Sequence, residues 1–179
     1  LEEFGLLASA SLHEIRPGGR IKLGEFELEF IRVRHSVVDG VGLAIQTPLG
    51  LVVHTGDFKI SHDNSDGLAT DVNRFALCGH EGVLALLSDS TNVEKEGYTI
   101  SAREIGATLA RLTEGAPGRI IIALFASNIT RIRQIVEIAK ARGKKIVFNG
   151  RSIEVAVGLA KSLGYLQVPP AMELSIEEI

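Results

Sequence analysis

The spacing of apolar residues constrains the fold of this chain more than any other feature of its sequence. Near residue 80 this spacing changes from one typical of strands to one in which strands and helices alternate. Before that point, residues 41–47 and 51–54 are short apolar runs on either side of Pro48-Leu49-Gly50, which predicts a β-hairpin. Within residues 21–33, apolar and polar residues alternate, and near residue 31 the apolar positions shift by one residue. This predicts a strand with a bulge or a register break. The first part of the chain is therefore expected to be mainly β.

Beyond residue 80, short apolar runs alternate with helical patterns, which is typical of βαβ units and a parallel sheet. Ser101 and Glu104 have the spacing of a capping box, so a helix is expected to begin there. The predicted strands are 83–87, 120–125 and 146–148, and further helices are predicted over 129–139 and 155–163. A polar stretch at 60–71 separates the two patterns, so we expect an α/β protein with domains at 1–80 and 81–179.

The composition excludes several classes of protein. The net charge is -3, from 22 acidic and 19 basic residues, so any contact with nucleic acid has to be local. The longest apolar runs fall far short of the roughly 20 residues of a membrane-spanning helix. The single cysteine, Cys78, allows no internal disulfide, and no signal peptide is visible. We therefore expect a cytoplasmic protein without a membrane span and, because it starts at Leu1, a chain truncated at both ends.

Polar turns follow each of the three strands predicted beyond residue 80. In an open parallel sheet, ligands bind beyond the carboxyl ends of the strands, where helix N-termini present free N–H groups. Asp89 would repel a phosphate there unless it serves a metal, a proton transfer or a hydroxyl. Serine and asparagine are also the usual helix caps, and this alternative stays open. The residues expected at this phosphate-binding edge, besides Asp89, are Ser90, Asn92, Ser127, Asn128, Arg131, Arg151 and Ser152.

A histidine and an aspartate stand where strands end in the β-rich part. His35 follows the strand predicted to end near residue 34, and Asp57 follows the one ending near His54. Imidazole nitrogen and carboxylate oxygen are the usual non-sulfur ligands of zinc. Two ligands do not complete a zinc site, and a hydrogen-bonded or surface histidine is the alternative for His35. Cys78 is interpreted as a small buried hydrophobic residue.

Several motifs resemble those of the ribonuclease J family, in the same order along the chain. Residues 35–42 and 54–59 resemble the third and fourth metal motifs of that family, and Ser88-Asp89-Ser90-Thr91-Asn92 looks like its first β-CASP motif. Residues 125–129 and 150–152 resemble its later signatures. The similarity runs from about Gly18 to Tyr165. The resemblance is specific because several separate motifs occur in the same order as in the family.

The resemblance implies a partial metallo-β-lactamase αββα sandwich plus a partial β-CASP domain with a parallel sheet. It implies hydrolysis of RNA phosphodiester bonds by two zinc ions, which polarise the phosphate and generate hydroxide. His35 would ligate one zinc, Asp57 would bridge both, and Asp89 would lie near the cleft. A homodimer or homotetramer is also implied. The residues that would contact RNA are Ser90, Asn92, Ser127, Asn128, Arg131, Arg151 and Ser152.

The sequence also departs from the family pattern. The histidine-rich second metal motif, the later β-CASP motifs and the last metal ligand are missing between Leu1 and Ile179. We therefore expect this chain alone to have no nuclease activity and weak or no zinc binding. Two other functions stay open: an RNA- or phosphate-binding module without hydrolysis, and a metallo-β-lactamase-fold hydrolase of a small molecule. The β-CASP-like half argues against the second, because a small substrate would not need the added cleft wall.

Overall fold

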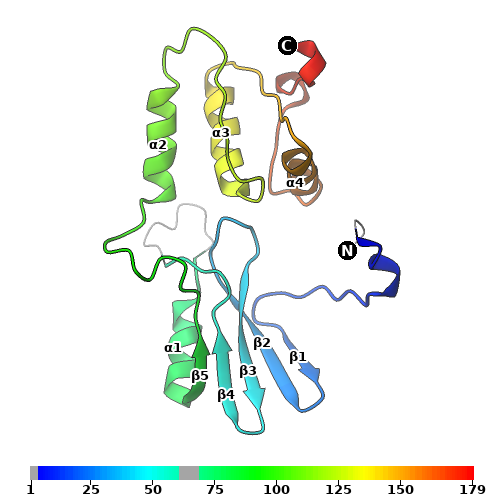
Figure 1. Ribbon diagram of the computed structural model, residues 1–179, viewed down its shortest axis with the longest axis vertical. Helices are drawn as coiled ribbons and strands as arrows, with labels where there is room; N and C mark the ends of the chain where they lie inside the picture. The colour runs from blue at the N-terminus through cyan, green and yellow to red at the C-terminus, as the bar shows by residue number, and fades with distance from the viewer. Residues whose placement is uncertain (1–3, 61–68) are drawn as a thin grey trace.

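The computed structural model describes residues 4–60 and 69–179, and the expected α/β class is confirmed. Figure 1 shows a sheet covered on one face by a helix, and a second part built from helices. The strands are β1 (Arg20–Leu23), β2 (Phe26–Arg32), β3 (Val41–Thr47), β4 (Gly50–His54) and β5 (Val83–Leu87). The helices are α1 (Val72–Glu81), α2 (Ala102–Leu112), α3 (Ile129–Ala141) and α4 (Arg151–Ser162), with short 3-10 turns at Leu7–Ser9, Pro170–Met172 and Ile176–Glu178.

The sheet has the order β1-β2-β3-β4-β5, with antiparallel pairs up to β4 and a parallel pair between β4 and β5. The predicted hairpin is confirmed, because Thr47 pairs with Gly50 in the register of β3 and β4. The prediction of one strand with a bulge or a register break over 21–33 is wrong. This stretch forms β1 and β2, joined by a turn at Gly24, where φ is 60°. The alternation of apolar and polar residues breaks down at Phe30 and Ile31 because both are buried. Neighbouring side chains of a strand point to opposite faces of the sheet, so both faces are covered at the end of β2.

The parallel pairing lies elsewhere than expected. β5 was predicted to share a parallel sheet with 120–125 and 146–148, but it pairs with β4 and continues the first sheet. Residues 120–125 form no strand, and 146–148 contribute only an isolated parallel bridge between Ile146 and Glu173. An apolar run indicates extended backbone but does not identify its partner strand. The domain division at residues 80 and 81 stays a prediction.

Helix α1 covers one face of the sheet and was not predicted. The Asp71 side chain caps it by accepting a hydrogen bond from the Arg74 backbone N–H, and it ends at Gly82. Phe75 and Cys78 lie three residues apart on its inner face. The prediction that Cys78 is a small buried residue is confirmed, since it is 1% exposed. The core between α1 and the sheet contains Ile31, Ala44, Leu51, Val53 and Cys78.

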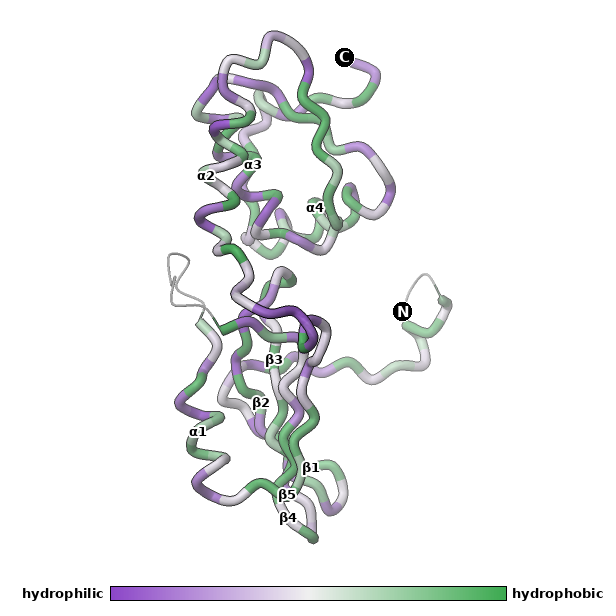
Figure 2. The backbone as a smooth tube through the Cα atoms, turned by 60° about the vertical axis from the view of Figure 1, so that its left-hand side comes forward, coloured by the Kyte–Doolittle hydropathy of each residue, from purple (hydrophilic) through white to green (hydrophobic). Residues whose placement is uncertain are grey.

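The helical part contains α2, α3 and α4, as the sequence predicted. The capping box at Ser101 and Glu104 is confirmed, and the Asn128 side chain caps α3. Within the described parts of the chain, no helix is long and apolar enough to cross a membrane. Figure 2 shows hydrophobic stretches running through both parts. The core of the helical part comprises Ile129, Ile132, Val136, Val157, Ala160, Leu166 and Met172.

An ion pair joins α1 to the strand beneath it. The Arg74 guanidinium donates to both carboxylate oxygens of Glu29, at 2.6 and 3.0 Å, and Arg20 donates to Glu29 from the neighbouring strand. The Glu29 side chain is only 13% exposed. The hydrogen bonds from Arg74 hold the pKa of Glu29 below its ordinary value. This pair therefore stabilises the fold at neutral pH.

Replacing Glu29 with glutamine is expected to lower the free energy of unfolding by about 2 kcal/mol at pH 7, between the values for exposed and buried pairs. Because the folded pKa is lowered, this stabilisation is present above the unfolded pKa and is lost as pH falls through the folded pKa. Urea unfolding at several pH values tests this. The Glu14→Gln variant is the control, since Glu14 pairs with Arg16 where both side chains are over three-quarters exposed. A Glu29→Gln effect that persists in acid would contradict the prediction.

Candidate active site at the carboxyl edge of the sheet

Three loops leave the sheet at the same edge. Strands β2 and β4 are each antiparallel to β3, and β5 is parallel to β4, so β2, β4 and β5 run in one direction. Their carboxyl ends therefore lie at one edge. His35 follows β2, Asp57 follows β4 and Asp89 follows β5. The fold brings together the three residues that the sequence proposed as metal ligands and catalytic carboxylate.

The loop that carries His35 is held at both ends. At its base the Val33 N–H donates to the Gly40 carbonyl at 3.0 Å. Directly before Gly40, Asp39 has a φ of 56°, unusual for a residue other than glycine, and its carboxylate accepts a hydrogen bond from the Tyr165 hydroxyl. Val38 packs against the core of the helical part. The loop is thus a contact between the sheet and the helical part.

The loop that carries Asp57 makes a tight turn directly after β4. Gly56 has a φ of 61°, and a Cβ at this position would lie 2.7 Å from the Val41 carbonyl oxygen. The Gly56 N–H donates to Nδ1 of His54 at 3.0 Å. His54 is therefore a hydrogen-bond acceptor for the turn. Asp57 itself is exposed at the edge.

Asp89 is an anion held by hydrogen bonds. Its Oδ1 accepts from the Thr91 hydroxyl at 2.6 Å and from the Thr91 N–H at 3.0 Å. These bonds hold the pKa of Asp89 below its ordinary value. A carboxyl group with a lowered pKa suits cation binding better than proton donation at neutral pH.

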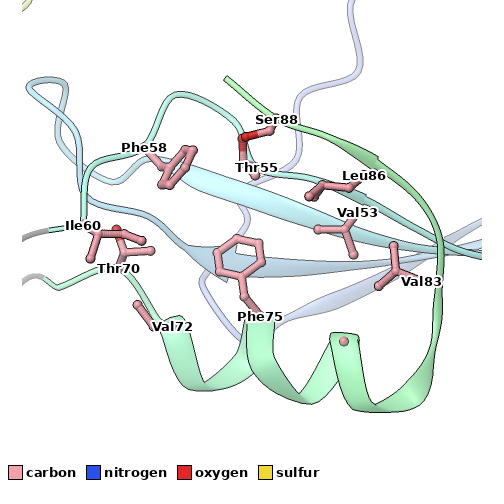
Figure 3. Close-up of a pocket in the computed structure, with 11 residues that line it drawn as sticks. Val53, Thr55, Phe58, Ile60, Thr70, Val72, Phe75, Val83, Leu86 and Ser88 are labelled. Carbon is pink, nitrogen blue, oxygen red and sulfur yellow. The ribbon is translucent and has the colours of Figure 1, made fainter. Parts of the chain in front are cut away.

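Two buried threonines join these loops, and the sequence analysis missed both. The Thr55 hydroxyl accepts from the Asp89 N–H at 3.0 Å, and the Thr70 hydroxyl accepts from the Arg34 N–H at 2.9 Å. They are 7% and 8% exposed. Figure 3 shows Thr55 beside Ser88, and Thr70 beside Ile60, at the edge of an apolar pocket between α1 and the sheet. Single threonines in loops carry no pattern that sequence periodicity detects.

The predicted RNA-binding residues Ser90 and Asn92 lie in the turn after β5. With Asp89, Lys59 and Tyr98 they line a pocket of about 380 Å³. The Lys59 ammonium donates to the Ile100 carbonyl at 3.2 Å. Hydrogen-bonding side chains and the exposed aromatic residue Tyr98 thus line the same pocket as Asp89.

The remaining predicted RNA-binding residues lie in the helical part, in two turns that do not share the sheet of β5. Asn128 serves as the cap of α3, as the alternative interpretation expected, and burial lowers the pKa of Arg131, which donates to Gln134. Ser127 is exposed before α3, and Arg151 and Ser152 are exposed in the first turn of α4, which has no side-chain cap. The expected meeting of three turns at one parallel sheet edge is therefore wrong. Strand pairing places only the Asp89 turn on the sheet.

The donor atoms at this edge do not form a complete metal site. His35 and Asp57 have the chemistry that zinc prefers. Among residues 4–60 and 69–179, however, no group of three or more histidine, cysteine, aspartate or glutamate side chains is placed to hold a metal ion. Further ligands would be needed for tight binding.

Comparison with protein-family models gives a match over residues 117–179 to the model described as "Ribonuclease J, beta-CASP domain". This match covers α3, α4 and the segment that follows them. For residues before 117, similarity to known proteins is found by comparison with individual relatives.

Curated proteins match the whole chain. Ribonuclease J of Thermus thermophilus is 42% identical over 181 residues, which is 100% of this chain and 31% of that protein. Ribonuclease J 1 of Streptococcus pyogenes is 40% identical over 179 residues, covering 100% of this chain and 32% of that protein. The chain thus spans about a third of the length of these relatives.

Among solved structures, a protein of unknown function from Enterococcus faecalis V583 has the same fold. The TM-score is 0.62 at 18% sequence identity, and the match covers 94% of this chain and 42% of that one. At this identity the likeness concerns the fold alone.

Proposed function

Because the chain belongs to the ribonuclease J family, we propose that the complete protein is a zinc-dependent ribonuclease that hydrolyses RNA phosphodiester bonds. Cleavage proceeds from the 5′ end, internally, or both. This chain supplies part of the active site. The observation that carries the proposal is the convergence of His35, Asp57 and Asp89 at one sheet edge through β2, β4 and β5.

In this proposal His35 and Asp57 are zinc ligands, and Asp89 is the catalytic carboxylate beside them. The described residues hold too few donors for a full site, so the proposal needs further ligands from outside residues 4–60 and 69–179. The lowered pKa of Asp89 keeps its carboxylate negatively charged at neutral pH, which favours cation binding at this edge. This chain by itself is expected to be inactive and to bind zinc weakly.

RNA is the proposed partner, and its contacts are local because the chain is slightly acidic overall. Ser90 and Asn92 line the pocket beside Asp89, and the other predicted contacts lie before or within α3 and α4. We place the protein in the cytoplasm as a homodimer or homotetramer. The buried, unpaired thiol of Cys78 is compatible with a reducing compartment.

The test is an RNA cleavage assay on the complete gene product, with and without a chelator. We expect cleavage of single-stranded RNA that is lost on chelation and recovered when zinc is added back. Cleavage that resists chelation would exclude the zinc mechanism. Salt-dependent RNA binding without cleavage would favour the alternative of an RNA-binding module. Hydrolysis of a small molecule with no action on RNA would favour the third function.

A further inference from the structure

The hydroxyl of Thr70 lies between the two loops that carry His35 and Asp57. Its Oγ1 accepts a hydrogen bond from the Arg34 N–H at 2.9 Å and donates one to the Lys59 carbonyl at 2.8 Å. Arg34 directly precedes His35, and Lys59 follows Asp57 by two residues. One side chain therefore bridges the backbones of both loops.

Thr70 is itself held firmly. Its side chain is buried, and the next residue, Asp71, caps α1 and donates its N–H to the Arg32 carbonyl at 3.0 Å. The Arg74–Glu29 ion pair fixes the same helix to β2. The two loops are also joined directly, since the Lys59 N–H donates to the Arg34 carbonyl at 2.7 Å. Thr70 therefore connects the two loops to a rigid helix start.

We propose that Thr70 is a positioning residue that sets the spacing between His35 and Asp57 through these two hydrogen bonds. The inference rests on the proposed function, in which these two side chains are zinc ligands. A hydroxyl donates one hydrogen bond and accepts two, so both contacts need the oxygen atom. The methyl group of the threonine contributes packing in the pocket of Figure 3 but neither bond.

The chain offers a matched control in the helical part. The Thr113 hydroxyl also both donates and accepts: it donates to the Leu109 carbonyl at 2.7 Å, with the Ala110 carbonyl at 3.1 Å, and accepts from the Arg142 guanidinium at 2.8 Å. Thr113 follows the end of α2, away from the three loops. Replacing either threonine with valine removes the same kinds of bond and keeps the side-chain shape.

The experiment measures zinc dissociation constants of the complete gene product by competition with a chromogenic chelator. Thr70→Val is expected to weaken zinc binding about 10- to 100-fold, the range found when residues that orient metal ligands are lost. Thr70→Ser, which keeps the hydroxyl, is expected to bind zinc like the wild type. Thr113→Val is expected to leave zinc affinity unchanged although it loses equivalent bonds.

The outcomes separate the two claims. Wild-type protein that binds no zinc would overturn the proposed function and this inference with it. Zinc binding by Thr70→Val equal to that of the wild type would overturn the inference alone, as would equal weakening in Thr113→Val.

Hydrogen exchange in the zinc-free wild type decides the matter if Thr70→Val does not fold. The Arg34 amide, which donates to Thr70, is expected to exchange slowly. Exchange at the rate of an unstructured peptide would overturn the inference.

Discussion

The complete gene product with Asp57 replaced by asparagine is expected to cleave RNA at least about 100-fold more slowly than the wild type, because losing a direct ligand exceeds the effect of losing a residue that orients one. Asparagine has nearly the shape of aspartate but lacks the negative charge that holds a divalent cation. The exposed position of Asp57 after the Gly56 turn means that the fold does not depend on its carboxylate. Initial rates on single-stranded RNA at saturating zinc measure the effect.

Asp71→Asn is the matched control for this variant. It makes the same chemical change beside the same loops, and asparagine caps a helix as well as aspartate does. The Asp71 carboxylate accepts from the Arg74 N–H at 2.9 Å, a bond that the asparagine oxygen also accepts. We expect wild-type rates. Equal losses in both variants would show that general disturbance of the edge, rather than loss of a ligand, explains the result.

Replacing Gly56 with alanine is expected to destabilise the protein by about 3 kcal/mol, from a left-handed backbone and a steric clash. The φ of 61° disfavours any side chain, and the added Cβ would lie 2.7 Å from the Val41 carbonyl oxygen. Backbone rather than a flexible side chain has to move, so the strain is not easily relieved. Since Asp57 follows directly, zinc affinity should fall as well.

Gly143→Ala separates these two causes. Gly143 also has a φ of 61°, just beyond α3, but a Cβ there meets no atom within 4 Å. In this variant the free energy of unfolding should fall only by the cost of placing alanine in a left-handed backbone, about 1 kcal/mol. Urea unfolding of both variants gives the difference. If Gly143→Ala is as unstable as Gly56→Ala, the clash with Val41 contributes nothing and the described turn is wrong.

Much of the local structure was predictable because its signals lie close together in the sequence. The hairpin at residues 48–50 depends on a proline and a glycine, and the start of α2 depends on Ser101 and Glu104. Helix α1 was missed because its short apolar face, Phe75 and Cys78, follows a long polar stretch. His35, Asp57 and Asp89 were proposed from residue type and resemblance; their convergence was implied by the resemblance alone, because no local pattern in the sequence brings the three together.

The sequence by itself determined the hairpin of β3 and β4, the start of α2 and the existence of α3 and α4, because capping, turn and periodicity signals involve only neighbouring residues. Only the tertiary structure decided that β5 pairs with β4, and hence that Asp89 joins the edge of His35 and Asp57. Strand pairing uses backbone groups that every residue has, so an apolar run does not specify its partner. Thr55 and Thr70 were missed for a similar reason: their hydroxyls bond to backbone groups of other loops, and no local pattern in the sequence shows this.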